Sequence, residues 1–214
     1  MSHRERRRAA SAAGVLINEI FINDRSLHKT IEQFKDRINW KNLNYDHLLD
    51  VIFLDTYKAY IDWASVSTSM WLVPQIVGKY EKHIIWELFS EYLGYLRGFS
   101  YKWLVKYEHL IDFKSIRGFI HTPVHFLSRH SAIWSHSQWI SISSSTTLQM
   151  PFIRTYQEKV HWQAISEFQK LDYEFIKEFQ DKIHIPLLMQ NDRISKSVKT
   201  ELKSRMHEFG RLNF

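Results

Sequence analysis

Aromatic and aliphatic residues recur along this chain every 23 residues, separated by polar stretches. Tryptophan marks the period most clearly: Trp40, Trp63 and Trp86 are each 23 residues apart, and Trp139 and Trp162 repeat that spacing further along. Aliphatic or aromatic residues keep the same phase two, six and nine positions before Trp40, Trp63, Trp86 and Trp162, and an apolar residue follows three positions after all five tryptophans. Such self-similarity is typical of repeat proteins. The pattern predicts an array of copies of one short unit.

Each copy is predicted to contain two short helices. The positions nine, six and two before the tryptophan are spaced three and four residues apart, which places them on one helical face, as in residues 175–183. The tryptophan, here called the anchor of its copy, begins a second and shorter helix that includes a Ser or Asn four positions later. Asp50, Asp172 and Ser100 precede the first helix at equivalent places, where each side chain can cap it.

Seven copies are predicted. Their anchors are Trp40, Trp63, Trp86, Phe113, Trp139, Trp162 and Ile185. Phe113 fills the gap between Trp86 and Trp139, because matching residues lie six and two before it and three after it. That gap holds seven residues more than two periods, so an irregular stretch is expected at 100–139. Because so small a unit cannot bury an indole alone, each anchor is expected to pack in a core that neighbouring copies share.

The sequence therefore predicts an all-α fold, an α-solenoid of about seven two-helix repeats. Residues 1–26 are interpreted as a basic N-terminal arm and leading helix, residues 27–194 as the repeat array, and residues 195–214 as a basic C-terminal helix that caps it. Only 6 Gly and 4 Pro are present, too few for the frequent turns of a β-sandwich or barrel. No apolar run approaches the roughly 20 residues of a transmembrane helix, so no transmembrane segment is expected.

The net charge of +6 is concentrated at the two ends of the chain. Residues 9–190 contain 19 basic and 19 acidic residues, so the body is neutral. The candidate contacts for an acidic partner or for phosphate are Arg4, Arg6, Arg7, Arg8, Lys196, Lys199, Lys203 and Arg205. The phosphate could belong to nucleic acid or to a lipid headgroup. The alternative for the C-terminal group is a set of solvated caps that keep the end of the array soluble.

Residues that could carry chemistry are sparse. The absence of cysteine excludes disulfides, thiol catalysis and cysteine-based metal sites, and is compatible with a reducing intracellular setting. His121 and His125 could bind zinc in the cluster that also contains His130 and His136, but Pro123 lies between them and no acidic residue is adjacent. These histidines are more readily explained as exposed or hydrogen-bonded loop residues. No nucleotide-binding, hydrolase or metalloprotease motif occurs, so neither an enzyme nor a cofactor is expected.

The pattern W-x-x-aliphatic-Ser, followed by a turn and a helix of the form E-F-I-x-x-F-x-D-K-I, is most complete at residues 162–185. It resembles the short tryptophan-anchored helical repeats of large DNA virus proteins of the mimivirus-like, marseillevirus-like and chlorovirus-like groups. The resemblance covers residues 27–194. It implies an α-solenoid without a catalytic site that binds proteins.

Three functions follow as hypotheses. The first is a structural or interaction protein that binds other proteins, capsid or virion proteins among them, for example as a minor capsid protein located in the virion or the host cytoplasm. A host-directed adaptor would use the same architecture. The second is a nucleic-acid-binding protein that uses its basic termini. The third is an enzyme or metalloprotein centred on residues 121–136.

Overall fold

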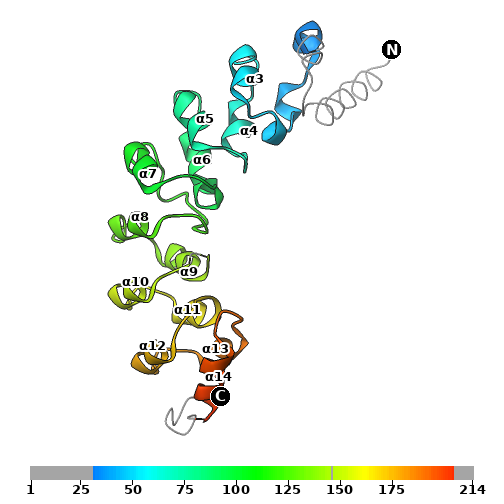
Figure 1. Cartoon of the computed structure of the whole chain (residues 1–214). Coiled ribbons are helices and arrows are strands. Elements are labelled where there is room, and N and C mark those ends of the chain that lie inside the picture. The colour runs from blue at the N-terminus through cyan, green and yellow to red at the C-terminus, as the bar shows by residue number, and fades with distance from the viewer. Residues whose placement is uncertain (1–30, 146, 205–214) are drawn as a thin grey trace. The chain divides into compact units, whose positions relative to one another are not determined.

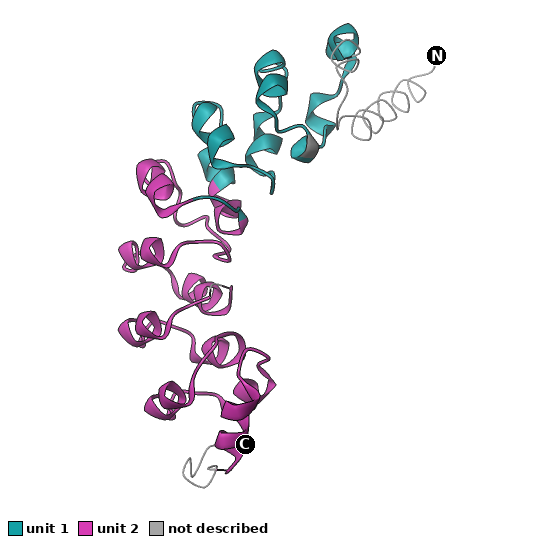
Figure 2. Cartoon of the chain, in the orientation of Figure 1, with its two compact units in different colours: residues 1–89, 96–99 teal, residues 90–95, 100–214 magenta. Residues whose placement is uncertain are grey.

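The computed structural model describes residues 31–145 and 147–204 (Figure 1). Over these residues the chain is all helical and contains no β-strand, which confirms the predicted all-α class. The chain divides into two compact units (Figure 2). Unit 1 comprises residues 1–89 and 96–99, and unit 2 comprises residues 90–95 and 100–214. None of the described helices has the length and apolar composition needed to span a membrane.

The helices of unit 1 are short. Residues 31–34 are helical and continue into the 3-10 helix η1. The elements are η1 Lys35–Arg37, η2 Trp40–Asn42, η3 Tyr45–His47, α3 Val51–Thr56, α4 Trp63–Ser67 and α5 Pro74–Lys79. Helix α6, Trp86–Tyr92, begins in unit 1 and continues into unit 2. The predicted first helices of the second and third copies correspond to α3 and α5, and the second helices begin at an anchor.

Unit 2 alternates the same two kinds of helix. Its elements are η4 Leu93–Tyr95, α7 Tyr101–Tyr107, α8 Val124–Arg129, α9 His136–Ser145, α10 Met150–Thr155, α11 Trp162–Phe168, α12 Tyr173–Glu178, α13 Ile185–Gln190 and α14 Lys196–Ser204. Within this unit α8, α10 and α12 lie in one row, and α9, α11 and α13 lie in another (Figure 1). Helix α11 contacts both α9 and α13. Unit 2 therefore consists of two layers of stacked helices.

The predicted helix caps are confirmed. The side chains of Asp50, Ser100 and Asp172 each accept a hydrogen bond from the backbone N–H three residues later, at 2.9, 3.2 and 2.8 Å. Each cap satisfies one of the backbone N–H groups left without a partner at the start of a helix, and such a cap stabilises by about 1 kcal/mol. The Ser195 hydroxyl accepts the N–H of Val198 in the same way, 23 residues after the Asp172 cap. Helix α14 thus starts as the first helix of a further copy would.

Aliphatic and aromatic side chains at two positions of the period form the core. The residues named below at these two positions are all 0% exposed. Nine positions before an anchor these residues are Leu54, Val77, Ile153 and Ile176, and three positions after an anchor they are Val66, Phe89, Ile142, Ile165 and Leu188. One set comes from the first helices and the other from the second helices, so within each unit the core lies between these two kinds of helix.

Extra residues occur in two places. The cap of the next first helix lies ten positions after the anchor in the regular copies, as for Trp40 and Asp50 or Trp162 and Asp172. In the third copy it lies fourteen positions after the anchor, from Trp86 to Ser100, because η4 follows α6. This extension begins before residue 100, outside the irregular range 100–139 expected from the sequence. The second lies between α8 and Trp139.

The first extension brings two glycines into contact. A Cβ atom on Gly94 would lie 1.5 Å from the carbonyl oxygen of Gly118, and one on Gly118 would lie 2.1 Å from the Tyr95 ring. The carbonyl of Gly94 also accepts the N–H of His121 at 2.9 Å. Only glycine allows the two backbone segments to approach this closely.

Candidate protein-interaction surface

Four tryptophan anchors, Trp40, Trp63, Trp139 and Trp162, each pack against an aromatic residue of the next copy. The ring centroids lie 5.5 Å apart for Trp40–Tyr57, 5.3 Å for Trp63–Tyr80, 5.4 Å for Trp139–Tyr156 and 5.0 Å for Trp162–Phe179. In every pair the second ring lies six positions before the following anchor. Trp40, Trp139 and Ile185 are buried, and Trp63, Trp86, Phe113 and Trp162 are half-buried. The rings therefore join one copy to the next.

The indole N–H groups are also satisfied within the array. Four of them donate to the backbone carbonyl five residues earlier: Trp40 to Lys35 at 2.9 Å, Trp63 to Lys58 at 3.3 Å, Trp86 to Glu81 at 3.1 Å and Trp162 to Gln157 at 2.9 Å. For Trp40 that carbonyl lies in η1, and for the other three it lies in the turn directly after the preceding first helix. Trp40, Trp63 and Trp162 are thus held both by a ring of the next copy and at the indole nitrogen, as packing residues are.

The serine four positions after the anchor links neighbouring copies. Ser143 is fully buried, donates to the carbonyl of Trp139 at 2.7 Å, and accepts the N–H of His161, the residue before the next anchor, at 2.9 Å. Ser67 and Ser166 make the same two bonds, at 2.6 and 2.9 Å and at 2.8 and 2.9 Å. Sequence reasoning located this serine but missed its role. The signal was its fixed distance from a buried tryptophan.

Two copies without this serine satisfy the same groups in other ways. In the first copy the Tyr45 hydroxyl donates to the carbonyl of Trp40 at 2.8 Å and accepts the N–H of Asp62 at 3.0 Å. Burial raises the pKa of this hydroxyl to about 12. In the fourth copy the buried Gln138 amide donates to the carbonyl of its anchor, Phe113, at 2.7 Å. The requirement is for a polar group at this place rather than for serine itself.

Ion pairs connect successive first helices at the surface. Lys79 contacts Asp55 at 2.6 Å, and Arg154 contacts Glu178 at 2.7 Å. Hydrogen bonds from Lys79 and then Tyr80 hold the pKa of Asp55 below its ordinary value, and Arg154 does the same for Glu178. Exposed pairs of this kind contribute little to stability. They do neutralise charge along this face.

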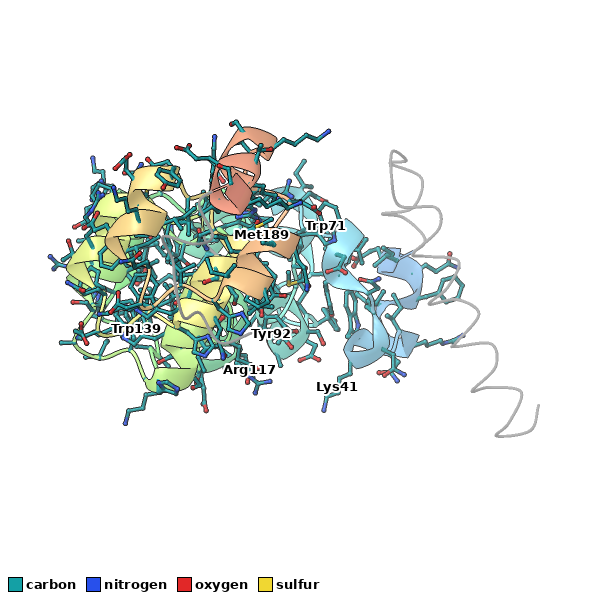
Figure 3. The ribbon with its side chains drawn as sticks, turned by 90° about the horizontal axis from the view of Figure 1, so that it is seen from below. Lys41, Trp71, Tyr92, Arg117, Trp139 and Met189 are labelled. Carbon is teal, nitrogen blue, oxygen red and sulfur yellow. The ribbon has the colours of Figure 1, made fainter. Side chains whose placement is uncertain are left out.

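The most exposed tryptophan among the described residues is Trp71, and it lies outside the repeat phase. Its exposed fraction is 63%, and that of the neighbouring Met70 is 48%. Both lie in the Trp71 loop, defined here as residues 69–73, between α4 and α5 (Figure 3). At the equivalent place, eight positions after the anchor, the last four copies have the exposed polar residues His121, Thr147, Lys170 and Arg193, whereas the first copy has the buried Leu48. A tryptophan at a solvent-facing position is the signal that sequence reasoning overlooked.

The Trp71 loop is held on both sides of this exposed pair. The buried Ser69 hydroxyl donates to the carboxylate of Asp46 and accepts the N–H of Trp71, the latter at 3.2 Å. Leu72 is only 2% exposed. The loop is thus anchored to the preceding copy while Met70 and Trp71 face solvent.

The basic candidates fall into two groups. Arg4, Arg6, Arg7, Arg8 and Arg205 lie outside the described residues. Lys196, Lys199 and Lys203 lie on α14, which is fixed by the buried Leu202. Lys199 is half-buried at the place that the fully buried Ile176 occupies in α12. Within residues 31–145 and 147–204, no carboxylate forms an ion pair with any of these three lysines.

The structure separates the histidine candidates. His121 and His125 are exposed, and the ring of His125 lies 6.1 Å from that of Tyr101. His130 instead enters the core beside Phe113, at a ring distance of 4.4 Å. Across the part of the chain that the structure describes, no group of three or more His, Asp or Glu side chains could hold a metal ion.

Comparison with known proteins gives no relative from which a role could be transferred: the chain matches no protein-family model, no curated protein and no solved structure.

Proposed function

We propose that this chain is a non-enzymatic, protein-binding scaffold, an α-solenoid of seven two-helix copies with basic ends. The observation that carries the proposal is the serine bridge of Ser67, Ser143 and Ser166, which joins the same two backbone groups each time. A contact repeated at the repeat period is what neighbouring copies stacked in one geometry would make. The indoles and buried polar groups serve this stacking, which leaves the outer surface for partners.

The Trp71 loop is the proposed contact surface for a protein partner. Tryptophan and methionine are enriched at protein interfaces, and a few such side chains carry most of the binding energy. Trp71 and Met70 are exposed on a loop already fixed by Ser69 and Leu72, so little conformational entropy would be lost on binding. These properties fit an apolar cleft on another protein.

The viral resemblance supports a specific form of this proposal. Under it the partner is a capsid or other virion protein, the chain is a minor virion component, and its location is the virion or the host cytoplasm. A host-directed adaptor is the alternative, and it would use the same surface.

A matched pair of variants tests the protein-binding proposal. Full-length protein carrying Trp71→Ala should lose partner capture, from infected cells or purified particles, by about 30-fold, the effect of removing a binding hot spot of about 2 kcal/mol. Ile52→Ala removes another exposed apolar side chain of unit 1, on α3, and should have no effect. Equal capture by both variants and the parent protein would refute the role of Trp71, and absence of any saturable protein partner would refute the scaffold proposal.

A nucleic-acid-binding function is the second candidate, favoured by Lys196, Lys199 and Lys203 of α14, which form no ion pair with a carboxylate of the described residues. It predicts sequence-independent binding that weakens steeply between 50 and 200 mM salt, with a dependence reduced by about one counterion for each lysine replaced by glutamine. Fluorescence anisotropy with labelled single-stranded and duplex oligonucleotides measures both. Binding that does not depend on salt, or that the triple substitution leaves unchanged, would rule out this use of α14.

A further inference from the structure

His130 occupies a place in unit 2 that tyrosine occupies in other copies. It is the residue that ends α8, and Tyr57, Tyr80 and Tyr156 end α3, α5 and α10 in the same backbone conformation. Those tyrosines pack on or near the preceding anchor, and His130 likewise lies 4.4 Å from the Phe113 ring. Unlike tyrosine, histidine changes its charge near neutral pH.

The imidazole is enclosed by aromatic rings. Phe126 lies 4.6 Å and Trp134 6.1 Å from it, and the side chain is only 15% exposed. Its Nε2 atom is buried and makes no hydrogen bond, although it lies 3.3 Å from Oε2 of Glu108. A buried polar atom without a hydrogen bond is uncommon in proteins and is costly, more so when it carries a charge.

The nearest carboxylate is already engaged by another cation. Arg129 donates to both oxygens of Glu108, from Nε at 2.9 Å and from Nη2 at 2.8 Å. The charged groups that face His130 are therefore Glu108, from the turn after α7, and Arg129, from α8 itself; the remaining neighbours are the three aromatic rings. An imidazolium here would gain a shared carboxylate and meet the repulsion of the guanidinium.

We propose that His130 is a proton-responsive joint between the copies anchored at Phe113 and Trp139. It is neutral while α7 and α8 are packed together, and its protonation in mildly acidic solution loosens this packing.

The direction in which stability changes with pH follows from the groups around His130. Burial lowers the pKa of His130, the charge of Glu108 opposes that shift in part, and Arg129 reinforces it. A histidine whose pKa is lower in the folded than in the unfolded state stabilises the fold above its ordinary pKa, about 6.5. That contribution is lost as the pH falls below 6.5 toward the folded value. The joint should therefore be tight at pH 7.5 and weaker at pH 5.5.

Two measurements on the full chain test the joint. The imidazole signals are followed by NMR from pH 8 to 5, with His130→Tyr used to assign the His130 signal. Hydrogen exchange is measured at pH 7.5 and 5.5 and corrected for the intrinsic rate. The midpoint of the His130 titration should lie below 6.5, and opening of α7 and α8 should increase at pH 5.5 by at most about tenfold, because pH 5.5 is only about one unit below the ordinary pKa of histidine. Helix α3, which ends in Tyr57, serves as the internal control and should not change.

Arg129→Met provides an independent arm. With the guanidinium gone, the carboxylate of Glu108 is free for the imidazolium, so the titration midpoint of His130 should rise and the acid-induced opening should shrink. A midpoint at or above 6.5 in the unmodified protein, or equal corrected exchange of α7 and α8 at both pH values, overturns the proposal. The titrations of the unmodified protein and of Arg129→Met decide the question even if His130→Tyr does not fold.

Discussion

The serine bridge makes a sharp prediction at two adjacent positions of α9. Ser143→Ala removes a hydroxyl that donates to Trp139 and accepts from His161, across the boundary between two copies. Ser144→Ala is the matched control, because its hydroxyl donates to the carbonyl of Ile140 at 3.0 Å, four residues earlier, and makes no bond to another copy. Both variants replace a serine of α9 by alanine, and both remove a hydrogen bond to the carbonyl four residues earlier.

The expected difference can be estimated from the groups left behind. Without the hydroxyl, the N–H of His161 loses its hydrogen-bond partner at a site where Ser143 is 0% exposed, which costs about 1–3 kcal/mol. Alanine favours a helix over serine by about 0.5 kcal/mol at both sites. Ser143→Ala should therefore lower the free energy of unfolding by about 2 kcal/mol, and Ser144→Ala should leave it within about 0.5 kcal/mol.

Thermal unfolding and urea titration of the full chain measure this difference. For a protein of this size, 2 kcal/mol corresponds to a Tm about 4–8 °C lower. Hydrogen exchange should also show faster opening near residues 139–162 in Ser143→Ala alone. If the two variants have the same stability, the hydroxyl of Ser143 does not hold the copies together, and the reasoning about the bridge fails.

Three further comparisons test the packing. Gly94→Ala should destabilise by more than about 3 kcal/mol or prevent folding, because the new methyl group meets a backbone carbonyl, whereas Gly78→Ala inside α5 should not destabilise; calorimetry compares them. Trp162→Ala should cost about 3–5 kcal/mol in urea unfolding, and Trp71→Ala less than about 0.5 kcal/mol, since only the former ring packs on the next copy; similar losses would contradict the assignment. Asp172→Ala should cost about 1 kcal/mol through loss of the α12 cap, seen as a lower urea midpoint at unchanged slope.

Features set by neighbouring residues were predictable from the sequence. The helical class follows from apolar residues that are spaced three and four positions apart. The caps of α3, α7 and α12 follow from Asp50, Ser100 and Asp172, each of which directly precedes the first residue of its helix. Both signals involve residues within one or two helical turns of each other, so the local sequence is enough to predict the helix and its start.

Contacts between distant residues were not predictable in the same way. The partner of Ser143 lies 18 residues away, and its identity depends on how closely two helices stack. In the fourth copy Gln138 takes the place of the serine, and whether its amide reaches the carbonyl of Phe113 also depends on how closely the helices stack. The contact of Gly94 with Gly118 exists only because the chain is longer between Trp86 and Ser100. The exposure of Trp71, by contrast, could have been inferred from the polar residues at the equivalent positions of the last four copies.

The shortness of the helices bears on how the chain folds. The α-helices described here are between five and ten residues long, and isolated helices below about 12–15 residues are marginal in water. None of them is expected to persist before its neighbours are in place, so folding should begin where two or three consecutive copies meet and then spread in both directions. A proteolytic cut in one connecting loop would accordingly weaken the helices on either side of the break.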